Sequence, residues 1–148
     1  SLIAEIHKKN MSYKYLEHST DAFIEVKAKT LEEAFLVAGK SVVETIIDLK
    51  NIQEIEEKSI KVKGRNLLNL LYNWLEEIVT ITITDGFAIK KFSVNIKKNT
   101  EYEIISKVSG EKLDLKKHGF KVEIKSPTFH LMEIKENDGV TMQYHLDL

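Results

Sequence analysis

The feature that most constrains the fold of this chain is an alternation of apolar and polar residues that recurs through its second half. The alternation has a period of two, which is typical of a β-strand with one buried and one solvated face. It is clearest at the end of the chain, where the apolar members are Val140, Met142, Tyr144, Leu146 and Leu148. Four further segments are predicted to be extended, namely 89–97, 102–108, 120–125 and 128–135.

Short turn sequences separate these predicted strands. Ser109–Gly110 and His118–Gly119 are predicted turns, and Asn137–Asp138–Gly139 before the last strand is a strong hairpin signal. Because tight turns join antiparallel neighbours, we expect mostly antiparallel sheets.

The first half adds a strand and a long helix. Residues 22–28 alternate in the manner of a half-buried strand. Thr30 and Glu33 then have the spacing of a capping box, in which each residue satisfies a polar group of the other at the start of a helix. Apolar residues follow at steps of three and four, which predicts a helix that runs to about Ile47.

A second helix is predicted after a short strand at 59–63. Asn66 is a suitable N-cap for it, and the residues that follow are apolar on nearly all sides, which is typical of a helix buried against a sheet. The sequence leaves the end of this helix open, because Thr80–Thr84 alternates threonine and isoleucine as a strand would. Asp85–Gly86 is expected to end the element.

These elements predict an α+β fold, a compact and mostly antiparallel β sandwich or barrel with two helices packed on it. The chain has 148 residues, which fits a single domain at 11–148. Residues 1–10 precede Met11 and are interpreted as a cloning or upstream remnant. The sequence contains no apolar run of transmembrane length and no signal-peptide pattern, so we expect a soluble, cytoplasmic protein.

Composition excludes several kinds of site. The chain has no cysteine, which rules out disulfides, thiol nucleophiles and thiolate zinc sites. Nucleophile-elbow and phosphate-loop motifs are absent, and the five histidines lack the paired spacing of a zinc centre. The net charge is −1 and Arg65 is the only arginine, which argues against holding nucleic acid by electrostatics alone. Direct, sequence-specific binding of nucleic acid is therefore not expected.

Two carboxylates, at Asp21 and Asp147, are candidate metal ligands. Asp21 comes just before a predicted strand, and Asp147 ends a well-patterned strand, where aspartate is disfavoured. If the two ends meet, these side chains and the terminal carboxylate of Leu148 would offer several hard oxygen ligands, suited to calcium or magnesium. The alternative is that Asp21 is a turn former and Asp147 a solvated strand end.

Lys125 is a third candidate. It stands two residues before Pro127, which forces Ser126 into an extended conformation, so the lysine precedes a rigid segment. A lysine held in this way can bind a carboxylate or a phosphate. The alternative is an ordinary exposed lysine on an edge strand.

The chain resembles the archease family in a series of blocks that occur in the family's order, from about Tyr13 to Leu148. The blocks are HSTDAFIE, TLEEAFLVAGKSVVETIIDL, NLLNLLYNWLEEIV, SGEKLDLKKHGFKVEIKSPTFHLMEI and the terminal HLDL. The chain departs from the family pattern at Thr20, where a small residue is usual. It also departs at Phe129, which lacks the hydroxyl of the usual tyrosine.

The resemblance implies an accessory protein of RtcB, the RNA ligase of tRNA splicing. Such a protein promotes guanylylation and multiple turnover of the ligase and broadens its nucleotide use, without being an enzyme itself. The resemblance also implies a divalent-metal site, with calcium in the family and magnesium or manganese as alternatives in the cell. By position in the family blocks, the metal ligands are Asp21, Asp147 and Leu148, and the essential lysine of the family corresponds to Lys125.

Two other functions stay open at this stage. One is a general chaperone or assembly factor for RNA-processing proteins, although the sequence shows no exposed apolar stretch that would favour it. The other is a metal-dependent hydrolase, for which His18 and His145 are the only suitable general bases near the predicted metal.

Overall fold

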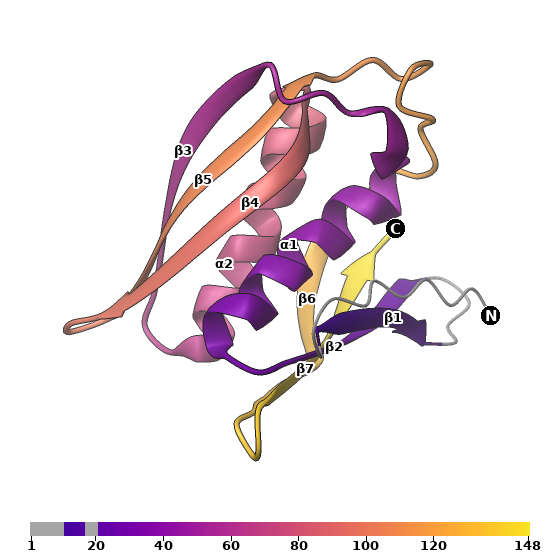
Figure 1. Cartoon of the computed structure of the whole chain (residues 1–148). Helices are drawn as coiled ribbons and strands as arrows, with labels where there is room; N and C mark the ends of the chain where they lie inside the picture. The colour runs from indigo at the N-terminus through magenta and orange to yellow at the C-terminus, as the bar shows by residue number, and fades with distance from the viewer. Residues whose placement is uncertain (1–10, 17–20) are drawn as a thin grey trace.

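The computed structural model describes residues 11–16 and 21–148. Within these residues it contains two α-helices, two short helical turns and seven strands (Figure 1). The elements are β1 (Ser12–Leu16), β2 (Asp21–Ala28), α1 (Leu31–Ile46), the 3₁₀ turn η1 (Leu49–Asn51), β3 (Glu56–Gly64), α2 (Leu67–Val79), the π-helical turn η2 (Thr80–Thr84), β4 (Phe87–Lys98), β5 (Tyr102–Lys112), β6 (Ser126–Lys135) and β7 (Val140–Asp147). The segment 1–10, interpreted above as a remnant, lies outside the described residues.

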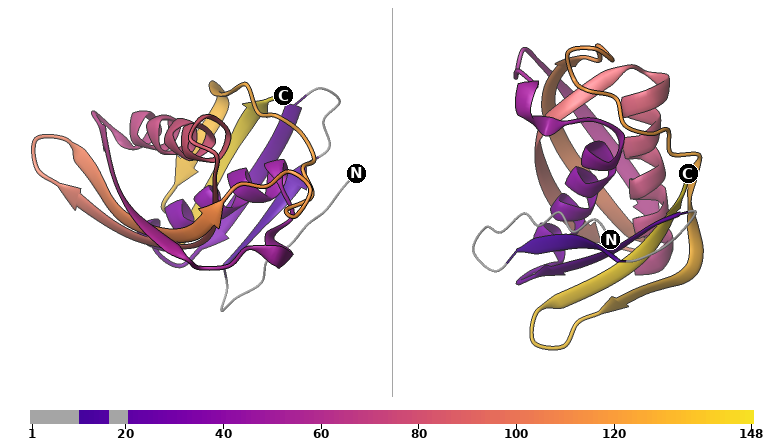
Figure 2. Two further views of the ribbon diagram at one scale, coloured as in Figure 1. Left: turned by 90° about the horizontal axis from the view of Figure 1, so that it is seen from above. Right: turned by 90° about the vertical axis from the view of Figure 1, so that its right-hand side faces the viewer.

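The strands form two open sheets, and the two helices lie between them. One sheet has the order β1-β2-β7-β6 and the other the order β3-β5-β4, with antiparallel pairing throughout. Helix α1 contacts β2 and β4, while α2 contacts β3 and β6, so each helix touches both sheets (Figure 2). The predicted α+β class and antiparallel pairing are confirmed. The sheets do not close into a barrel.

Both helices start at the N-caps that the sequence predicts. The Glu33 N–H donates to Thr30 Oγ1 at 3.2 Å, and the Thr30 hydroxyl donates to the Glu33 carboxylate at 3.0 Å. The Asn69 N–H donates to Asn66 Oδ1 at 2.9 Å. Caps of this kind typically stabilise a helix by about 1 kcal/mol. In the part of the chain that the structure describes, neither helix is long and apolar enough to cross a membrane.

Buried hydrogen bonds fix the helices to each other and to the four-stranded sheet. Trp74 of α2 is fully buried, and its Nε1–H donates to the carbonyl of Phe35 on α1 at 2.8 Å. Ser41 Oγ on α1 lies 2.5 Å from the hydroxyl of Tyr144 on β7. Burial raises the pKa of the Tyr144 hydroxyl, which therefore stays neutral. The strand that ends at Asp147 is thus attached to a rigid layer of helices.

Two local predictions are wrong, and one strand was not predicted. Residues 120–125 form an irregular loop rather than a strand, and β1 is an additional strand. Ser109–Gly110 lies inside β5 rather than at a turn. A Cβ on Gly110 would lie 1.8 Å from the carbonyl oxygen of Ala88, so the glycine allows the backbone of β4 to approach closely. The open question at Thr80–Thr84 is resolved by η2, which continues α2.

The loop between β5 and β6, residues 113–125, is held by a polar hub instead of strand pairing. The Glu111 carboxylate accepts hydrogen bonds from Gln53 N, Lys117 Nζ and His118 Nε2, each at 2.9 Å. The Nδ1 atom of the buried His118 accepts from the Asp114 N–H, which leaves Nε2 as the donor to Glu111. These hydrogen bonds, with that of His118 foremost, lower the pKa of Glu111 to about 2. The hub fixes the path of the chain toward Lys125.

Candidate metal site at the end of the four-stranded sheet

Three of the predicted site residues come together where strand ends meet at one edge of the four-stranded sheet. Asp21 is the first residue of β2 and lies directly opposite Asp147, the last residue of β7. On the other side of Asp147 lies Ser126, the first residue of β6. The main-chain N–H of Lys125 donates to the carbonyl of Asp147 at 2.7 Å. The strand register thus gathers residues from three distant parts of the sequence.

Asp21 and Asp147 project from the outer face of the sheet, away from the helices. Their neighbours Ala22 and Leu146 are buried on the inner face, and successive side chains of a strand point to opposite faces. Directly opposed residues in an antiparallel pair have Cβ atoms about 5 Å apart, and like charges at such positions are destabilising. A cation bound between the two carboxylates would offset this repulsion.

His145 lies beside the carboxylate pair and contacts Asp21. Its Nδ1 is 3.5 Å from Asp21 Oδ2, and its ring stacks on Phe23 with a centroid distance of 4.2 Å. The ring of His130 is 5.5 Å away from that of His145. Since His145 is 1% exposed and the Asp21 side chain 23% exposed, the histidine forms the buried side of the site. These contacts restrict the orientations that are open to the Asp21 carboxylate.

Lys125 is exposed and directly precedes β6, in agreement with the extended geometry predicted from Pro127. Pro127 is buried and pairs with Leu146 on an edge strand, a position where proline is tolerated. A groove of about 410 Å³ has Lys125, Ser126 and Pro127 in one wall and residues of α2 and η2 in the other. The backbone of Lys125 is therefore fixed to Asp147, while its side chain is accessible.

The donors at this end of the sheet are oxygen atoms, which suits a hard cation. Two carboxylates and the main-chain oxygens of Leu148 are ligands of the type that calcium and magnesium take. Among residues 11–16 and 21–148, no group of three or more His, Asp or Glu side chains is arranged to hold a metal. A site here would therefore combine the carboxylate pair with main-chain oxygens, as the sequence predicts. His18 and Thr20 of the first family block lie outside the described residues.

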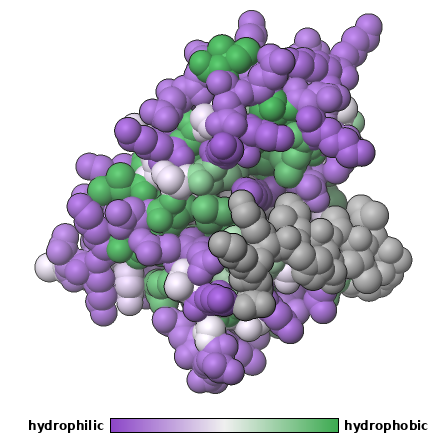
Figure 3. Space-filling model, in the orientation of Figure 1, coloured by the Kyte–Doolittle hydropathy of each residue, from purple (hydrophilic) through white to green (hydrophobic). Residues whose placement is uncertain are grey.

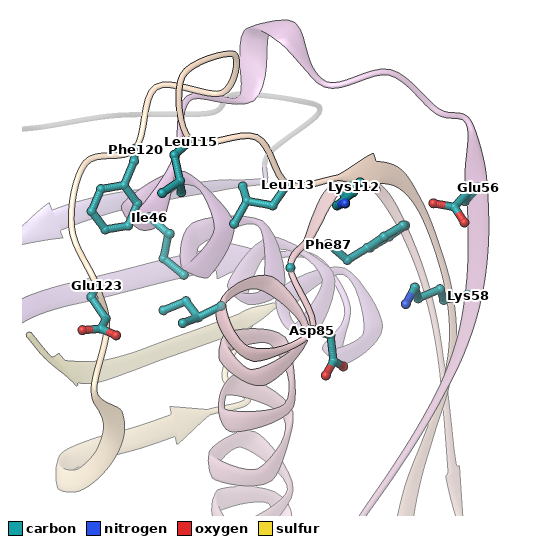
Figure 4. A pocket seen from close by; sticks show the side chains of 12 residues that line it. Ile46, Glu56, Lys58, Asp85, Phe87, Lys112, Leu113, Leu115, Phe120 and Glu123 are labelled. Carbon is teal, nitrogen blue, oxygen red and sulfur yellow. The ribbon is translucent and has the colours of Figure 1, made fainter.

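A separate cavity of about 610 Å³ lies under the 113–125 loop. Figure 4 shows Leu115 and Phe120 of this loop on one side of it and Phe87 of β4 on another. The Nζ atom of Lys58 lies 4.8 Å from the centroid of the Phe87 ring. The carboxylate pair does not line this cavity, so it is a different feature from the candidate metal site.

An exposed apolar group on β6 is not predicted from the sequence. Phe129 and Leu131 are 52% and 55% exposed, and the Phe129 ring stacks on Tyr72 of α2 at 4.4 Å. Leu131 has a φ of 56° within a register shift between Thr128 and Glu133, which turns these side chains out of the regular pattern. The signal in the sequence is the pair Leu131–Met132, two consecutive large apolar residues that interrupt the alternation expected for a regular strand.

Comparison with known proteins gives a consistent result over nearly the whole chain. Residues 13–148 match the family described as Archease protein family. Protein archease of Pyrobaculum islandicum is 35% identical over 143 residues, which cover 95% of this chain and 97% of that protein. Protein archease of Methanosarcina barkeri is 37% identical over 139 residues, which cover 92% of this chain and 95% of that protein.

Solved structures show the same fold. The solution structure of protein 1598 from Methanobacterium thermoautotrophicum has a TM-score of 0.79 and 29% identity, covering 92% of this chain and 98% of that one. The crystal structure of an archease from Thermotoga maritima has a TM-score of 0.60 over 90% of this chain and 94% of its own. It is 19% identical and supports the fold alone. On the family match and the identity to these relatives, the chain belongs to the archease family.

Proposed function

We propose that this protein activates an RtcB-type RNA ligase of tRNA splicing by promoting its guanylylation and multiple turnover. The observation that carries the proposal is the match of residues 13–148 to the archease family. In this proposal the protein is an accessory factor rather than an enzyme, it acts in the cytoplasm, and it extends the range of nucleotides that the ligase accepts.

We also propose that a divalent cation, calcium in the first instance, binds between Asp21 and Asp147 with main-chain oxygens of Leu148. Support comes from the cross-strand register, which places two carboxylates opposite each other, and from the hard oxygen donors that surround them. The cation would supply a fixed positive charge at this end of the sheet. His145 orients the Asp21 carboxylate, and its burial excludes water from one side of the site.

Lys125 is proposed as the residue that contacts the ligase or its bound nucleotide. Its main-chain N–H is bound to Asp147, so its side chain starts from a fixed position next to the carboxylate pair. An ammonium group at that position can bind a carboxylate or a phosphate as a point charge. The exposed end of the sheet therefore presents charges of both signs to a partner.

The free energy that this activation requires is small. A tenfold increase in turnover corresponds to about 1.4 kcal/mol of preferential interaction with the transition state. An accessory protein achieves this when it binds the competent conformer of the ligase more tightly than the incompetent one. A few charged contacts at the end of the sheet are sufficient for a difference of this size.

A multiple-turnover ligation assay tests the proposal, with the ligase limiting and the protein added at increasing molar ratios. Wild type is expected to stimulate turnover, while Asp21→Ala and Lys125→Ala are expected to lose at least about tenfold of the stimulation. Glu136→Ala and Lys135→Ala are matched controls, since both side chains are exposed and lie outside the site. Circular dichroism and thermal unfolding verify that each variant is folded. Absence of stimulation by folded wild type, with a ligase active on its own, would contradict the proposal.

A second candidate function is that of a chaperone, and the exposed apolar group on β6 favours it. Phe129 and Leu131 are exposed on β6, and Phe129 stacks on Tyr72 of α2, an apolar group of the kind that binds partly folded proteins. The related structure from Thermotoga maritima is described as a possible chaperone. A chaperone would suppress the aggregation of unrelated, heat-treated proteins, and Phe129→Ser with Leu131→Ser would abolish that effect. Suppression limited to the ligase would count against a general chaperone.

A further inference from the structure

The overall charge of −1 hides a strong separation of charge between the three-stranded sheet and the rest of the chain. The three-stranded sheet and its turn, residues 56–64 and 87–112, contain nine lysines and five glutamates, a net charge of +4. Since the whole chain carries −1, the remaining residues carry −5. Composition averages these two parts, and only the fold shows that the positive part is a single sheet.

One face of this sheet packs on the helices and the other is open to solvent. Ile60, Val62, Ile104 and Val108 are buried on the inner face. The residues between them point outward, and the antiparallel register aligns them in four cross-strand rows. The rows are Glu57–Ser109–Lys91, Ser59–Lys107–Ser93, Lys61–Ile105–Asn95 and Lys63–Glu103–Lys97. Five of the twelve positions are thus lysine and two are glutamate, and hydrophilic residues predominate on the face seen in Figure 3.

The ion pairs on this face leave two of its lysines available. Lys107 lies 3.9 Å from Glu57, and Lys63 lies 4.0 Å from Glu103, at long distances for ion pairs. Within the part of the chain that the structure describes, the ion pairs of the outer face do not include Lys61 or Lys97. These two lysines lie in adjacent rows on β3 and β4, about 12 Å apart across the intervening β5. Ile105 lies opposite Lys61 and Glu103 lies opposite Lys97, so one carboxylate borders the surface between the two lysines.

We propose that the outer face of the β3-β5-β4 sheet binds the sugar-phosphate backbone of single-stranded RNA, without regard to base sequence. Charge complementarity selects a polyanion, and the choice of RNA rests on the proposed role beside an RNA ligase. Phosphate contacts position a nucleic acid but carry no sequence information, and the face has no arginine for bidentate contacts to bases. The proposal is therefore consistent with the absence of any sequence-reading motif.

Fluorescence anisotropy with a labelled single-stranded RNA of about twenty nucleotides tests this inference in the absence of the ligase. Wild type is expected to bind at low salt, with an affinity that falls as salt is raised. The double variant Lys61→Glu/Lys97→Glu is expected to lose at least about tenfold in affinity, and its salt slope should fall by about 1.4, since each lost phosphate contact removes about 0.7. The control Lys29→Glu/Lys135→Glu makes the same change in net charge at exposed positions outside the sheet and should lose less than about twofold.

Several results would overturn the inference. The first is that wild type does not bind RNA at low salt, and the second is that the two glutamate double variants lose equal RNA affinity. The third is that Lys61→Glu/Lys97→Glu binds RNA normally but no longer binds the ligase, which would identify the face as a protein interface. Lys61→Gln/Lys97→Gln removes the charges without reversing them and should show an intermediate loss of RNA affinity. This variant keeps the test interpretable if the glutamate variant does not fold. Ligase stimulation is measured separately. Stimulation without RNA binding refutes only this inference, whereas RNA binding without stimulation refutes only the proposed function.

Discussion

Replacing Asp147 by Asn is expected to stabilise the metal-free protein and to weaken its response to calcium. The variant keeps the shape of the side chain and removes one of two like charges that face each other across β2 and β7. Opposed like charges in an antiparallel pair typically cost about 0.2–1 kcal/mol. In a chain of this size 1 kcal/mol shifts Tm by about 2–4 °C, so the variant should melt about 1–2 °C higher in the presence of a chelator.

Calcium should reverse this order. Free calcium at a hundred times its dissociation constant stabilises a protein that binds it by about 2.7 kcal/mol, equivalent to about 5–10 °C in Tm. Asp147→Asn loses a charged ligand and is expected to show less than about half of that shift at the same calcium concentration. Wild type should therefore be the less stable protein with chelator and the more stable protein with calcium.

Differential scanning calorimetry of the two proteins with chelator and with calcium measures this reversal, at low ionic strength so that the carboxylate repulsion is not screened. Glu136→Gln is the matched control, because it removes one exposed negative charge outside the site. Equal calcium shifts in wild type and Asp147→Asn would refute the metal site. A lower Tm for the variant with chelator would refute the argument from cross-strand repulsion.

Further predictions concern parts of the fold that support the site. Ser41→Ala leaves the buried Tyr144 hydroxyl without this partner and should lower the free energy of unfolding by about 1–3 kcal/mol in urea, with Tyr144→Phe in the same chain recovering part of the loss. Gly110→Ala places a Cβ 1.8 Å from the Ala88 carbonyl oxygen and should cost about 3 kcal/mol or more, measured in the same way. Because the pKa of Glu111 is lowered from 4.5 to about 2, its contribution to stability is present above pH 4.5 and is lost as the pH falls toward 2. Over that range Glu111→Gln should show a flatter dependence of unfolding free energy on pH than wild type, and parallel curves would contradict the role of its hydrogen bonds.

Local patterns in the sequence predict most elements of this fold, because each element carries its own signal. The caps at Thr30 and Asn66 depend on residues three positions away, and the final strand depends on a period of two. The prediction of a strand at 120–125 is wrong because the path of this segment depends on contacts with Glu111 and helix α1, which are distant in the sequence. The prediction of a turn at Gly110 is wrong for a similar reason, because glycine is favoured both in turns and where two strands approach closely.

The sequence predicts the members of the candidate site but not its geometry. Asp147 is a candidate because aspartate is disfavoured at the end of a well-patterned strand, and the family resemblance pairs it with Asp21. Their direct opposition follows from the β2–β7 register, which depends on the order of four strands in a sheet. The contact between His145 and Asp21 likewise depends on that register, because residues 21 and 23 of β2 lie opposite residues 147 and 145 of β7.

The candidate metal site and the lysine face should act independently, because they lie on different sheets at opposite ends of the molecule. In Figure 1 and in the left view of Figure 2, the chain end after β7 and the β4–β5 turn lie far apart, with helix α2 between them. Mutations that are distant and share no partners usually have additive effects. Lys61→Glu/Lys97→Glu should therefore keep the full calcium shift in Tm, while Asp147→Asn should keep the RNA affinity of wild type. Loss of both properties in either variant would mean that the two surfaces form one binding unit, and each would then need to be reinterpreted as part of a single interface.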